Sequence, residues 1–344
     1  MQWRIEYVPE LSGYTVEWAE PDNFFLSRRN ILYHSRDLRP PFEKFAVIGA
    51  PLWRRSASTF RLAQRLLRFQ VTNVIPLKNK DLFVTFDRSV GLIRDGKFEE
   101  IGGLNRPCRV LRSACAVDEK ENIFFGEYLA NAERGEMRVY RYRAGGDALD
   151  IAYTFPAGSI KHIHGIYFDK FTNSLFCLTG DAVNECQILQ SFDGFQTLNV
   201  IGRGDETWRA VSMLFSDRYL YYGMDAEFRE NHVYKLDRQT SERSSLGEVN
   251  GTIFYSKQIG DDRFFTTTAE NAPSQKENAA ALWQVDKDDS CRMLVAFQKD
   301  RWNKTLFQFG TIHFPYVNRL DDALYFHLVG VKGDNQTYRL VRDR

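Results

Sequence analysis

The feature that most constrains this chain is a pair of strand-like runs that recurs along its length. In the clearest copy, a run at 162–169 is followed about ten residues later by a second run at 175–181. Such pairs begin about 40 to 60 residues apart, which is typical of four-stranded blades joined by loops of variable length. We therefore expect an all-β fold, namely one β-propeller of four-stranded antiparallel blades, with seven blades favoured and six left open.

The repeated units account for most of the 344 residues, and their first strands begin near Tyr14, Val71, Arg112, His162, Trp208, Gly251 and Gly310. An N-terminal strand at 4–8 could complete the short last unit, which would remove an exposed sheet edge. No linker interrupts the pattern, so we expect a single domain over residues 1–344.

One segment departs from the repeat. Residues 56–69 have the spacing of a short amphipathic helix, with Phe60, Ala63 and Leu67 on one face. We expect a helical insertion that packs on the barrel. Because the segment carries several arginines, a helix that faces a partner or a membrane surface is the alternative.

Composition limits the classes of function. The net charge is +1, from 46 basic and 45 acidic residues, which argues against a generic nucleic-acid binder. No apolar run approaches the length of about 18 residues that indicates a membrane helix. The N-terminus lacks the apolar core of a signal peptide, and the five cysteines show no CxxC spacing. These features predict a cytoplasmic protein without a membrane span or a disulfide framework.

Two histidines are the sharpest local feature. His162 and His164 are two residues apart on a strand, so both side chains point to the same face. They lie at the start of an inner strand, where a propeller has its central funnel. Such a pair can act in acid–base chemistry or bind a metal, and the alternative is structural hydrogen bonding. No cofactor is predicted, but a divalent metal at His162, His164 and His313 is left open, with a carboxylate from Glu127, Asp181 or Glu185.

Other funnel candidates come from the same reasoning. We expect His162, His164, Glu127 and Tyr128 to be catalytic, and Arg112, Arg209, Trp208 and His313 to bind substrate. Guanidinium groups suit a carboxylate, sulfate or phosphate, although an inter-blade salt bridge is the alternative. Trp208 could stack on a sugar or pack in the core. Asp181 and Asp225 end second strands, and we interpret both as backbone caps.

A turn motif resembles a known family. Residues 191–198 are similar to the Asp box of sialidase-like (bacterial neuraminidase repeat) propellers. Ser191, Asp193 and Thr197 match the motif, Gly194 stands one place early, and Leu198 replaces the usual buried aromatic residue. The wider stretch from about 106 to 311 also resembles the sialidase-like propellers of bacterial polysaccharide metabolism, through residues 125–128, 162–165, 179–181, 185–186 and 208–211. The resemblance implies a propeller in a carbohydrate context, but the catalytic set of sialidases does not align here.

Two functions follow as hypotheses. In the first, the funnel acts on an anionic oligo- or polysaccharide, either as a lyase or as a glycoside hydrolase. A lyase would use Arg112 and Arg209 to hold the carboxylate and a funnel histidine to move protons. A hydrolase would need two facing carboxylates, for which Glu127 with Asp181 or Asp225 are the candidates. In the second, the protein is a non-catalytic propeller that binds a glycan or a protein. The sequence sets neither the sugar nor the oligomeric state.

Overall fold

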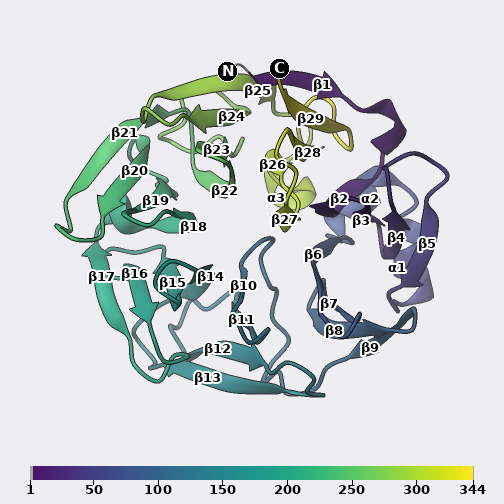
Figure 1. The fold of residues 1–344 in the computed structure, drawn as a ribbon, viewed down its shortest axis with the longest axis horizontal. Coiled ribbons are helices and arrows are strands. Elements are labelled where there is room, and N and C mark those ends of the chain that lie inside the picture. Colours follow the sequence, from purple (N-terminus) through teal and green to yellow (C-terminus); the bar gives the residue numbers. More distant parts are fainter. Residues whose placement is uncertain (1–2, 344) are drawn as a thin grey trace.

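The structure is a computed structural model that describes residues 3–343, and its strands form seven four-stranded blades around a central channel (Figure 1). The first strand of each blade lies nearest the channel and later strands lie progressively farther out. The all-β propeller with four-stranded antiparallel blades is therefore confirmed, and the number of blades is seven.

The first three blades follow one another along the chain. Their strands are β2 (Thr15–Glu20), β3 (Asn23–Arg28), β4 (Ile31–Ser35) and β5 (Glu43–Val47); β6 (Val71–Pro76), β7 (Leu82–Phe86), β8 (Ser89–Arg94) and β9 (Lys97–Glu100); and β10 (Cys115–Val117), β11 (Ile123–Gly126), β12 (Met137–Tyr142) and β13 (Leu149–Phe155). One parallel contact between Val47 and Lys97 joins the outer edges of blades one and two.

Blades four to six repeat the same order. Their strands are β14 (His162–Asp169), β15 (Ser174–Gly180), β16 (Cys186–Ser191) and β17 (Asn199–Gly204); β18 (Ala210–Phe215), β19 (Tyr219–Met224), β20 (Asn231–Asp237) and β21 (Arg243–Val249); and β22 (Ile253–Ile259), β23 (Asp262–Thr267), β24 (Ala279–Val285) and β25 (Cys291–Gln298). A short 3-10 helix, Glu206–Trp208, precedes β18, and another, Pro9–Leu11, precedes β2.

The last blade is closed by the beginning of the chain. It contains β26 (Thr311–His313), β28 (Ala323–Val329), β29 (Thr337–Arg342) and β1 (Trp3–Tyr7), while α3 (Lys304–Phe307) and β27 (Val317–Asn318) lie outside it. Strand β1 pairs antiparallel with β29, from Trp3 opposite Arg342 to Tyr7 opposite Tyr338. The expected closure by an N-terminal strand is confirmed, and it joins the two ends of the ring (Figure 1).

The hydrophobic core lies between the blades. Every residue of β7 and of β15 is buried, because neighbouring blades cover both faces of these second strands. Aromatic rings fill the gap between blades two and three, where Phe83 contacts Phe125 and Tyr142 at ring-centroid distances of 6.1 and 5.8 Å. Since the core is not in the channel, the starts of the inner strands are free to present polar groups there.

A register shift recurs near the start of the inner strands. Strands β2, β6, β14, β18 and β22 each lose register with their neighbour within the first three residues. In β2 and β14 the residue that the pairing skips is Glu17 and His164, respectively. Such a bulge re-aims a side chain. It therefore explains how inner strands of an apolar fold turn charged groups towards the channel.

The segment at 56–69 differs from its expectation. It contains two short helices, α1 (Leu52–Ala57) and α2 (Arg61–Leu66), instead of one. Phe60 lies between them and is 74% exposed, so it does not pack on the barrel as expected. The buried anchor is Arg65, whose Nη1 atom is 2.5 Å from Oδ2 of Asp300. None of the helices in the described part of the chain has the length and apolar character needed to cross a membrane.

The turn between β16 and β17 is held by side-chain oxygens. Ser191 Oγ donates to Oδ1 of Asp193 at 2.9 Å, and the amide of Thr197 donates to the same oxygen at 2.9 Å. Leu198, the position expected to be buried, is only half-buried. Phe195 is buried in its place and contacts Phe124, with ring centroids 5.8 Å apart.

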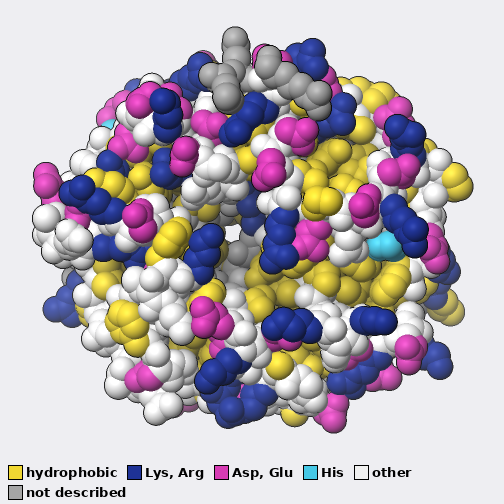
Figure 2. Space-filling model, in the orientation of Figure 1, with side chains coloured by type: hydrophobic (Ala, Val, Ile, Leu, Met, Phe, Trp, Pro, Cys, Tyr) yellow, Lys and Arg dark blue, Asp and Glu magenta, His cyan; other side chains and the backbone are white. Residues whose placement is uncertain are grey.

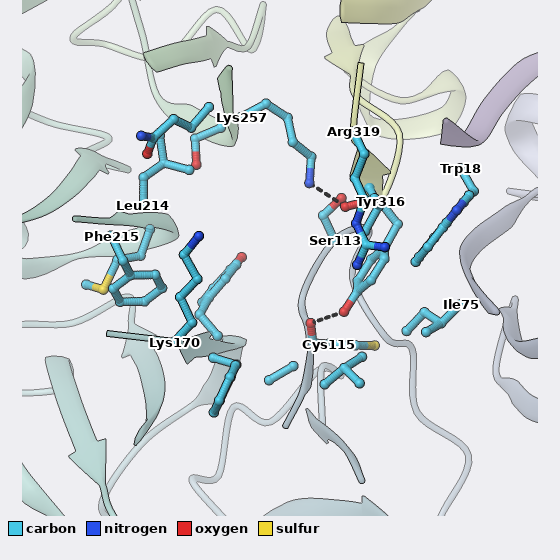
Figure 3. Close-up of a pocket in the computed structure, with 18 of the residues that line it drawn as sticks. Trp18, Ile75, Ser113, Cys115, Lys170, Leu214, Phe215, Lys257, Tyr316 and Arg319 are labelled. Carbon is cyan, nitrogen blue, oxygen red and sulfur yellow. Dashed lines mark hydrogen bonds between the residues drawn. The ribbon is translucent and has the colours of Figure 1, made fainter. Parts of the chain in front are cut away.

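The central channel contains two cavities. The start cavity, about 450 Å³, lies at the starts of the inner strands, and the end cavity, about 1030 Å³, lies at their ends (Figure 3). Among residues 3–343, Phe254 and Tyr255 are the two that line both. Figure 2 shows one face of the ring, which is hollowed at its centre and has Lys and Arg side chains beside the hollow.

Candidate functional site

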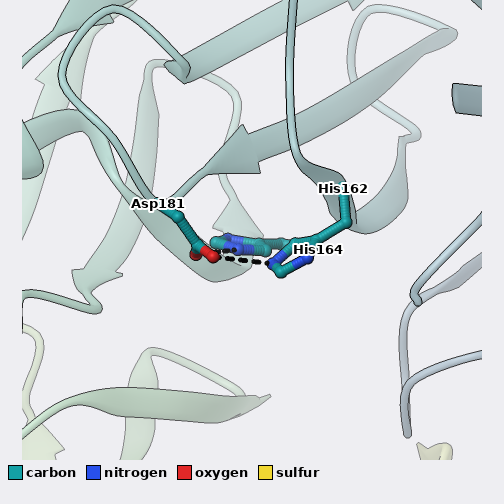
Figure 4. Close-up of side chains that lie close together, drawn as sticks. All are labelled: His162, His164 and Asp181. Carbon is teal, nitrogen blue, oxygen red and sulfur yellow. Dashed lines mark hydrogen bonds and ion pairs between the residues drawn. The ribbon is translucent and has the colours of Figure 1, made fainter. Parts of the chain in front are cut away.

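Two histidines and an aspartate meet in the start cavity (Figure 4). His162 and His164 come from β14, and Asp181 directly follows β15 of the same blade. The Nε2 atom of His162 is 3.3 Å from Oδ2 of Asp181, and the Nε2 atom of His164 is 3.4 Å from Oδ1. Both imidazoles thus converge on one carboxylate, although His164 is the bulged residue of its strand.

The tautomer of His164 follows from its partners. Its Nδ1 atom is 2.9 Å from the carbonyl oxygen of Ala210, which can only accept a hydrogen bond, so Nδ1 carries the proton. In the neutral ring the Nε2 lone pair then faces the carboxylate of Asp181, which is also an acceptor. Burial lowers the pKa of His164 and so disfavours the imidazolium form. This arrangement favours a cation between Nε2 and the carboxylate.

Asp181 is held in an uncommon backbone conformation. Its φ angle is +114°, a region that residues other than glycine rarely adopt and that often marks functional sites. Lys161 Nζ lies 2.7 Å from Oδ2 and Arg209 Nη2 lies 3.0 Å from Oδ1. Burial alone would raise the pKa of Asp181, but contacts with its neighbours, the hydrogen bond from His162 foremost, outweigh it and hold the pKa below its ordinary value.

Asp225 is a second carboxyl group of the start cavity, and unlike Asp181 it tends to keep its proton. Asp225 follows β19 and its Oδ2 atom is 3.0 Å from Nε of Arg209. Burial raises the pKa of Asp225 to about 8, and the charges of Glu270 and Asp181 add to this effect, although Arg209 opposes it. Arg209 therefore bridges one ionised carboxylate and one that holds its proton at neutral pH. Carboxyl groups whose pKa values are pushed apart suit acid and base roles.

Two arginines line the cavity, and the nearby carboxylates do not fully balance their positive charge. Arg109 lies 3.8 Å from Asp87, and Arg68 has no salt bridge within residues 3–343. Burial lowers the pKa of Arg109, and the neighbouring charge of Arg68 lowers it further. A buried guanidinium with a second positive charge beside it is stabilised when an anion enters the cavity. Neither arginine is recognisable from the strand pattern of the sequence, because both lie outside the inner strands.

Two tyrosines add aromatic surface. The ring of Tyr128 lies 4.3 Å from that of His162, and burial raises the pKa of this tyrosine to about 12. Tyr255 contacts His313 edge-on at 5.2 Å. His313 lines the cavity, but its Nε2 atom hydrogen-bonds Thr311 Oγ1 at 2.8 Å, and it is not one of the residues whose ligand atoms meet around Asp181. His313 is therefore outside the cluster of His162, His164 and Asp181 that the structure brings together.

Three expected site residues have structural partners instead. Arg112 lines the cavity, but its Nη1 atom is 2.5 Å from Oε2 of buried Glu17. Glu127 is fully buried and accepts hydrogen bonds from Arg106 and from Tyr140 Oη, at 2.8 and 2.9 Å. It is not part of the cavity wall.

Trp208 also lies away from the start cavity. Its ring stacks near Tyr222 at 6.1 Å, and the guanidinium of Arg243 lies 4.0 Å from the ring centre. Trp208 therefore packs against the core between blades four and five, as its alternative interpretation had it.

The interpretation of Asp181 and Asp225 as backbone caps is wrong. Among the described residues, neither carboxylate accepts a hydrogen bond from a backbone amide; their partners are the side chains named above. Lys161 and Glu270 were also missed. The sequence position of the two aspartates could have identified them as site residues. Each directly follows the second strand of its blade, and the end of that strand pairs with the start of the inner strand.

The three clustered side chains fit a divalent metal. Their ligand atoms all lie within 4.8 Å of one another. Ligands about 2.1 Å from a tetrahedral ion are separated by roughly 3.4 Å, and the two histidine-to-aspartate separations are 3.3 and 3.4 Å. Metal-binding histidines usually donate their other ring N–H to a carbonyl or carboxylate, as His164 does to Ala210. Two imidazoles and a carboxylate suit a first-row divalent ion.

Comparisons with known proteins give the fold. No protein-family model matches the sequence, and no curated protein sequence matches it. Among solved structures, the extracellular domain of BT4673 from B. thetaiotaomicron is similar over 100% of this chain, with a TM-score of 0.59 and 10% identity. This chain spans only 40% of that one.

Two further solved structures match nearly the whole chain. Oligogalacturonate lyase in complex with manganese has a TM-score of 0.59 at 7% identity, with 99% of this chain and 91% of that chain covered. A chain of the mitotic checkpoint complex has a TM-score of 0.57 at 9% identity, with 99% and 93% covered. At such low identities these likenesses concern the fold alone, and they show that this chain is a β-propeller.

Proposed function

We propose that the start cavity binds a divalent metal through His162, His164 and Asp181 and cleaves an acidic oligosaccharide by β-elimination. The observation that carries the proposal is the orientation of His164, whose unprotonated Nε2 faces the carboxylate of Asp181 at 3.4 Å. The likeness in fold to an oligogalacturonate lyase with manganese supports the choice of metal and substrate class.

The substrate would be anionic because the cavity contains arginine side chains whose positive charge the nearby carboxylates do not fully balance. Arg68 and Arg109 carry charge that Asp87 only partly balances. A bound metal would supply further positive charge to the substrate carboxylate. Neutralising that carboxylate acidifies the adjacent C–H bond, which is the demanding step of an elimination.

The proton transfers need a base and an acid from this chain. Glu270 lines the cavity, and its Oε1 accepts from the hydroxyls of Thr252 and Thr268 at 2.7 and 2.6 Å, so Oε2 is available as the base. Asp225, with a pKa of about 8, would donate its proton to the departing sugar oxygen. The C–H electrons form the new double bond while the C–O bond breaks. The histidines, with both rings engaged, would hold the metal rather than move protons.

Hydrolysis is the second candidate, favoured by the same pair of carboxyl groups. Glu270 and protonated Asp225 in one cavity resemble the base and acid of a glycoside hydrolase. The two reactions differ in what happens to water, since only hydrolysis adds one water to the products.

The test is mass spectrometry of products from oligogalacturonate and from its methyl-esterified form, each incubated with the protein and Mn²⁺. We expect unsaturated products without added water from the acidic substrate, little reaction with the ester, and loss of product in Asp225→Asn. Products heavier by one water would replace elimination by hydrolysis. Retention of the acidic glycan without product would leave a binding protein, and indifference to both substrates would contradict the proposal.

A further inference from the structure

The end cavity has its own set of polar groups, separate from the start cavity. It is about 1030 Å³ in volume and lies where the inner strands end, with side chains from several blades pointing into it (Figure 3). Lys257 on β22 reaches into this space from one side, and Trp18 and Tyr316 lie on the other. None of the proposed metal ligands lines it.

Lys257 is a half-buried ammonium group without a counter-ion. Its Nζ atom donates to the carbonyl oxygen of Tyr316 at 2.5 Å, and it forms no ion pair with a carboxylate of the described residues. Two of its three N–H donors therefore lack a protein acceptor. Burial lowers the pKa of Lys257 to about 8, which reports how poorly its charge is compensated. A desolvated cation of this kind favours an anionic ligand.

Three further donors of the cavity lack partners. Ser212, 3% exposed, and Ser113 each have a buried hydroxyl that makes no hydrogen bond, and the buried Nε1 of Trp18 is likewise unbonded. Buried polar groups are nearly always hydrogen-bonded. Three unpaired donors around one cavity therefore indicate that a molecule rich in acceptors, or ordered water, binds there. With Lys257, the wall offers four donor groups that the protein leaves unsatisfied.

The remaining charges of the wall lie mainly at its rim. Arg319 forms an ion pair with Glu20, and Lys78 lies 3.7 Å from Glu121. These pairs neutralise themselves. Lys170, by contrast, has no salt bridge within residues 3–343 and lies 5.1 Å from the ring centre of Phe171. Asp118 and Glu119 also lie in this wall without a salt bridge among the described residues, so the uncompensated positive charge is local to Lys257 and is not a property of the whole cavity.

Aromatic rings supply a flat surface beside these donors. Trp18 and Tyr316 are stacked, with centroids 6.2 Å apart and planes at 14°. Phe171 is 46% exposed, and Phe215 is half-buried in the same wall. Faces of this kind bind sugar or aromatic rings. The ligand chemistry is thus a ring that carries an anionic, acceptor-rich group.

We propose that the end cavity is a second binding site, for a small ring-bearing carboxylate. Its carboxylate would lie at Lys257 Nζ, within reach of the Ser113 and Ser212 hydroxyls, and its ring would lie against the aromatic wall. Acidic sugars and aromatic carboxylic acids share this chemistry. The proposal does not depend on the function proposed for the start cavity.

The test is calorimetric titration with D-galacturonate and with benzoate, in a His164→Ala, Arg68→Gln, Arg109→Gln background that removes a proposed metal ligand and the two unbalanced arginines of the start cavity. We expect at least one of the two to bind with one-to-one stoichiometry, which also separates the sugar source from the aromatic one. Lys257→Met should weaken that binding at least tenfold, whereas Lys276→Met, which removes an exposed lysine paired with Glu248 outside the cavity, should leave it unchanged.

Thermal unfolding distinguishes a ligand site from a structural lysine. If Lys257 serves a ligand, Lys257→Met should unfold at the same or a higher temperature, because it removes an uncompensated charge. If the variant fails to fold, Ser212→Ala tests the same wall and should weaken binding severalfold. Absence of binding by both probes, or affinity unchanged in Lys257→Met and Ser212→Ala, would overturn the proposal.

Discussion

Arg112, in the segment just before β10 of blade three, forms a buried ion pair with Glu17 of blade one, with Nη1 and Oε2 2.5 Å apart. Their side chains are 4% and 0% exposed. Arg112 also donates from Nη2 to the carbonyl of Val71 on blade two, at 2.7 Å. This guanidinium therefore links β2 and β6 to the segment that precedes β10, which is the salt-bridge interpretation of Arg112 rather than the substrate-binding one.

We expect Arg112→Met to lower the free energy of unfolding by about 3–5 kcal/mol, because it leaves the Glu17 carboxylate buried without its partner. The double variant with Glu17→Met should recover most of this loss. Urea denaturation of the single and double variants measures both effects. An Arg112→Met protein of normal stability that has lost affinity for acidic glycans would restore the substrate-binding role.

Activity should depend on the protonated form of Asp225. With a pKa of about 8, this acid would lose its proton above that pH, so turnover should fall on the alkaline side with an apparent pKa near 8. Asp225→Asn should reduce turnover by about 10²–10⁴-fold. A pH–rate profile of the wild-type protein that is flat through pH 9 would contradict this role.

The same group links stability to pH. Between the ordinary aspartate pKa of 3.8 and about 8, the folded protein holds a proton on Asp225 that the unfolded chain has released. The contribution of Asp225 to the unfolding free energy therefore falls as pH rises through this window. Asp225→Asn should remove that contribution, which urea denaturation at several pH values measures against the wild type.

Gly180 allows His164 and Arg209 to approach each other. A Cβ atom at this position would lie 2.8 Å from Cε1 of His164 and 3.0 Å from Cγ of Arg209. We expect Gly180→Ala to displace the imidazole and weaken Mn²⁺ binding by about 10–100-fold. Gly49→Ala is the matched control, because a Cβ there meets nothing within 4 Å. Equal affinities in the two variants would show that the ring position does not matter.

Lys161 should compete with the metal for Asp181. Its Nζ atom is 2.7 Å from Oδ2, the oxygen that also faces His162. Removing this positive charge should therefore tighten metal binding, and we expect a several-fold lower Kd for Mn²⁺ in Lys161→Gln. The exposed control is Lys276→Gln, whose lysine pairs with Glu248 at the outside of the ring. Weaker binding in Lys161→Gln would indicate that the lysine supports the site instead.

The sequence was sufficient for the fold because the propeller repeats its signal. Strand pairs such as those beginning at His162 and Trp208 recur often enough that the uncertain boundaries of one unit are compensated by the others. The closing strand β1 was also predictable, since the last unit was short of one strand. The two helices at 52–66 were less predictable from the sequence. Because α1 and α2 bury few side chains, they leave only a weak pattern of apolar residues.

The candidate site was only partly predictable. His162 and His164 were found because their spacing and position carry local information. Arg68 and Arg109 were not, because their charges matter only once distant loops meet around the start cavity. Glu127 and Trp208 illustrate the converse, since a chemically suitable residue near a strand end can be turned towards the core by its partners Tyr140 and Arg243.

The most direct test of the central claim is calorimetric titration of the metal-free protein with Mn²⁺ and Zn²⁺. The account predicts one ion per chain, with binding lost in His164→Ala and in Asp181→Asn but retained in His232→Ala, which removes a half-buried histidine that bonds Ser245. Binding that is absent in the wild type, or that persists unchanged in His164→Ala, would contradict a metal site at these residues.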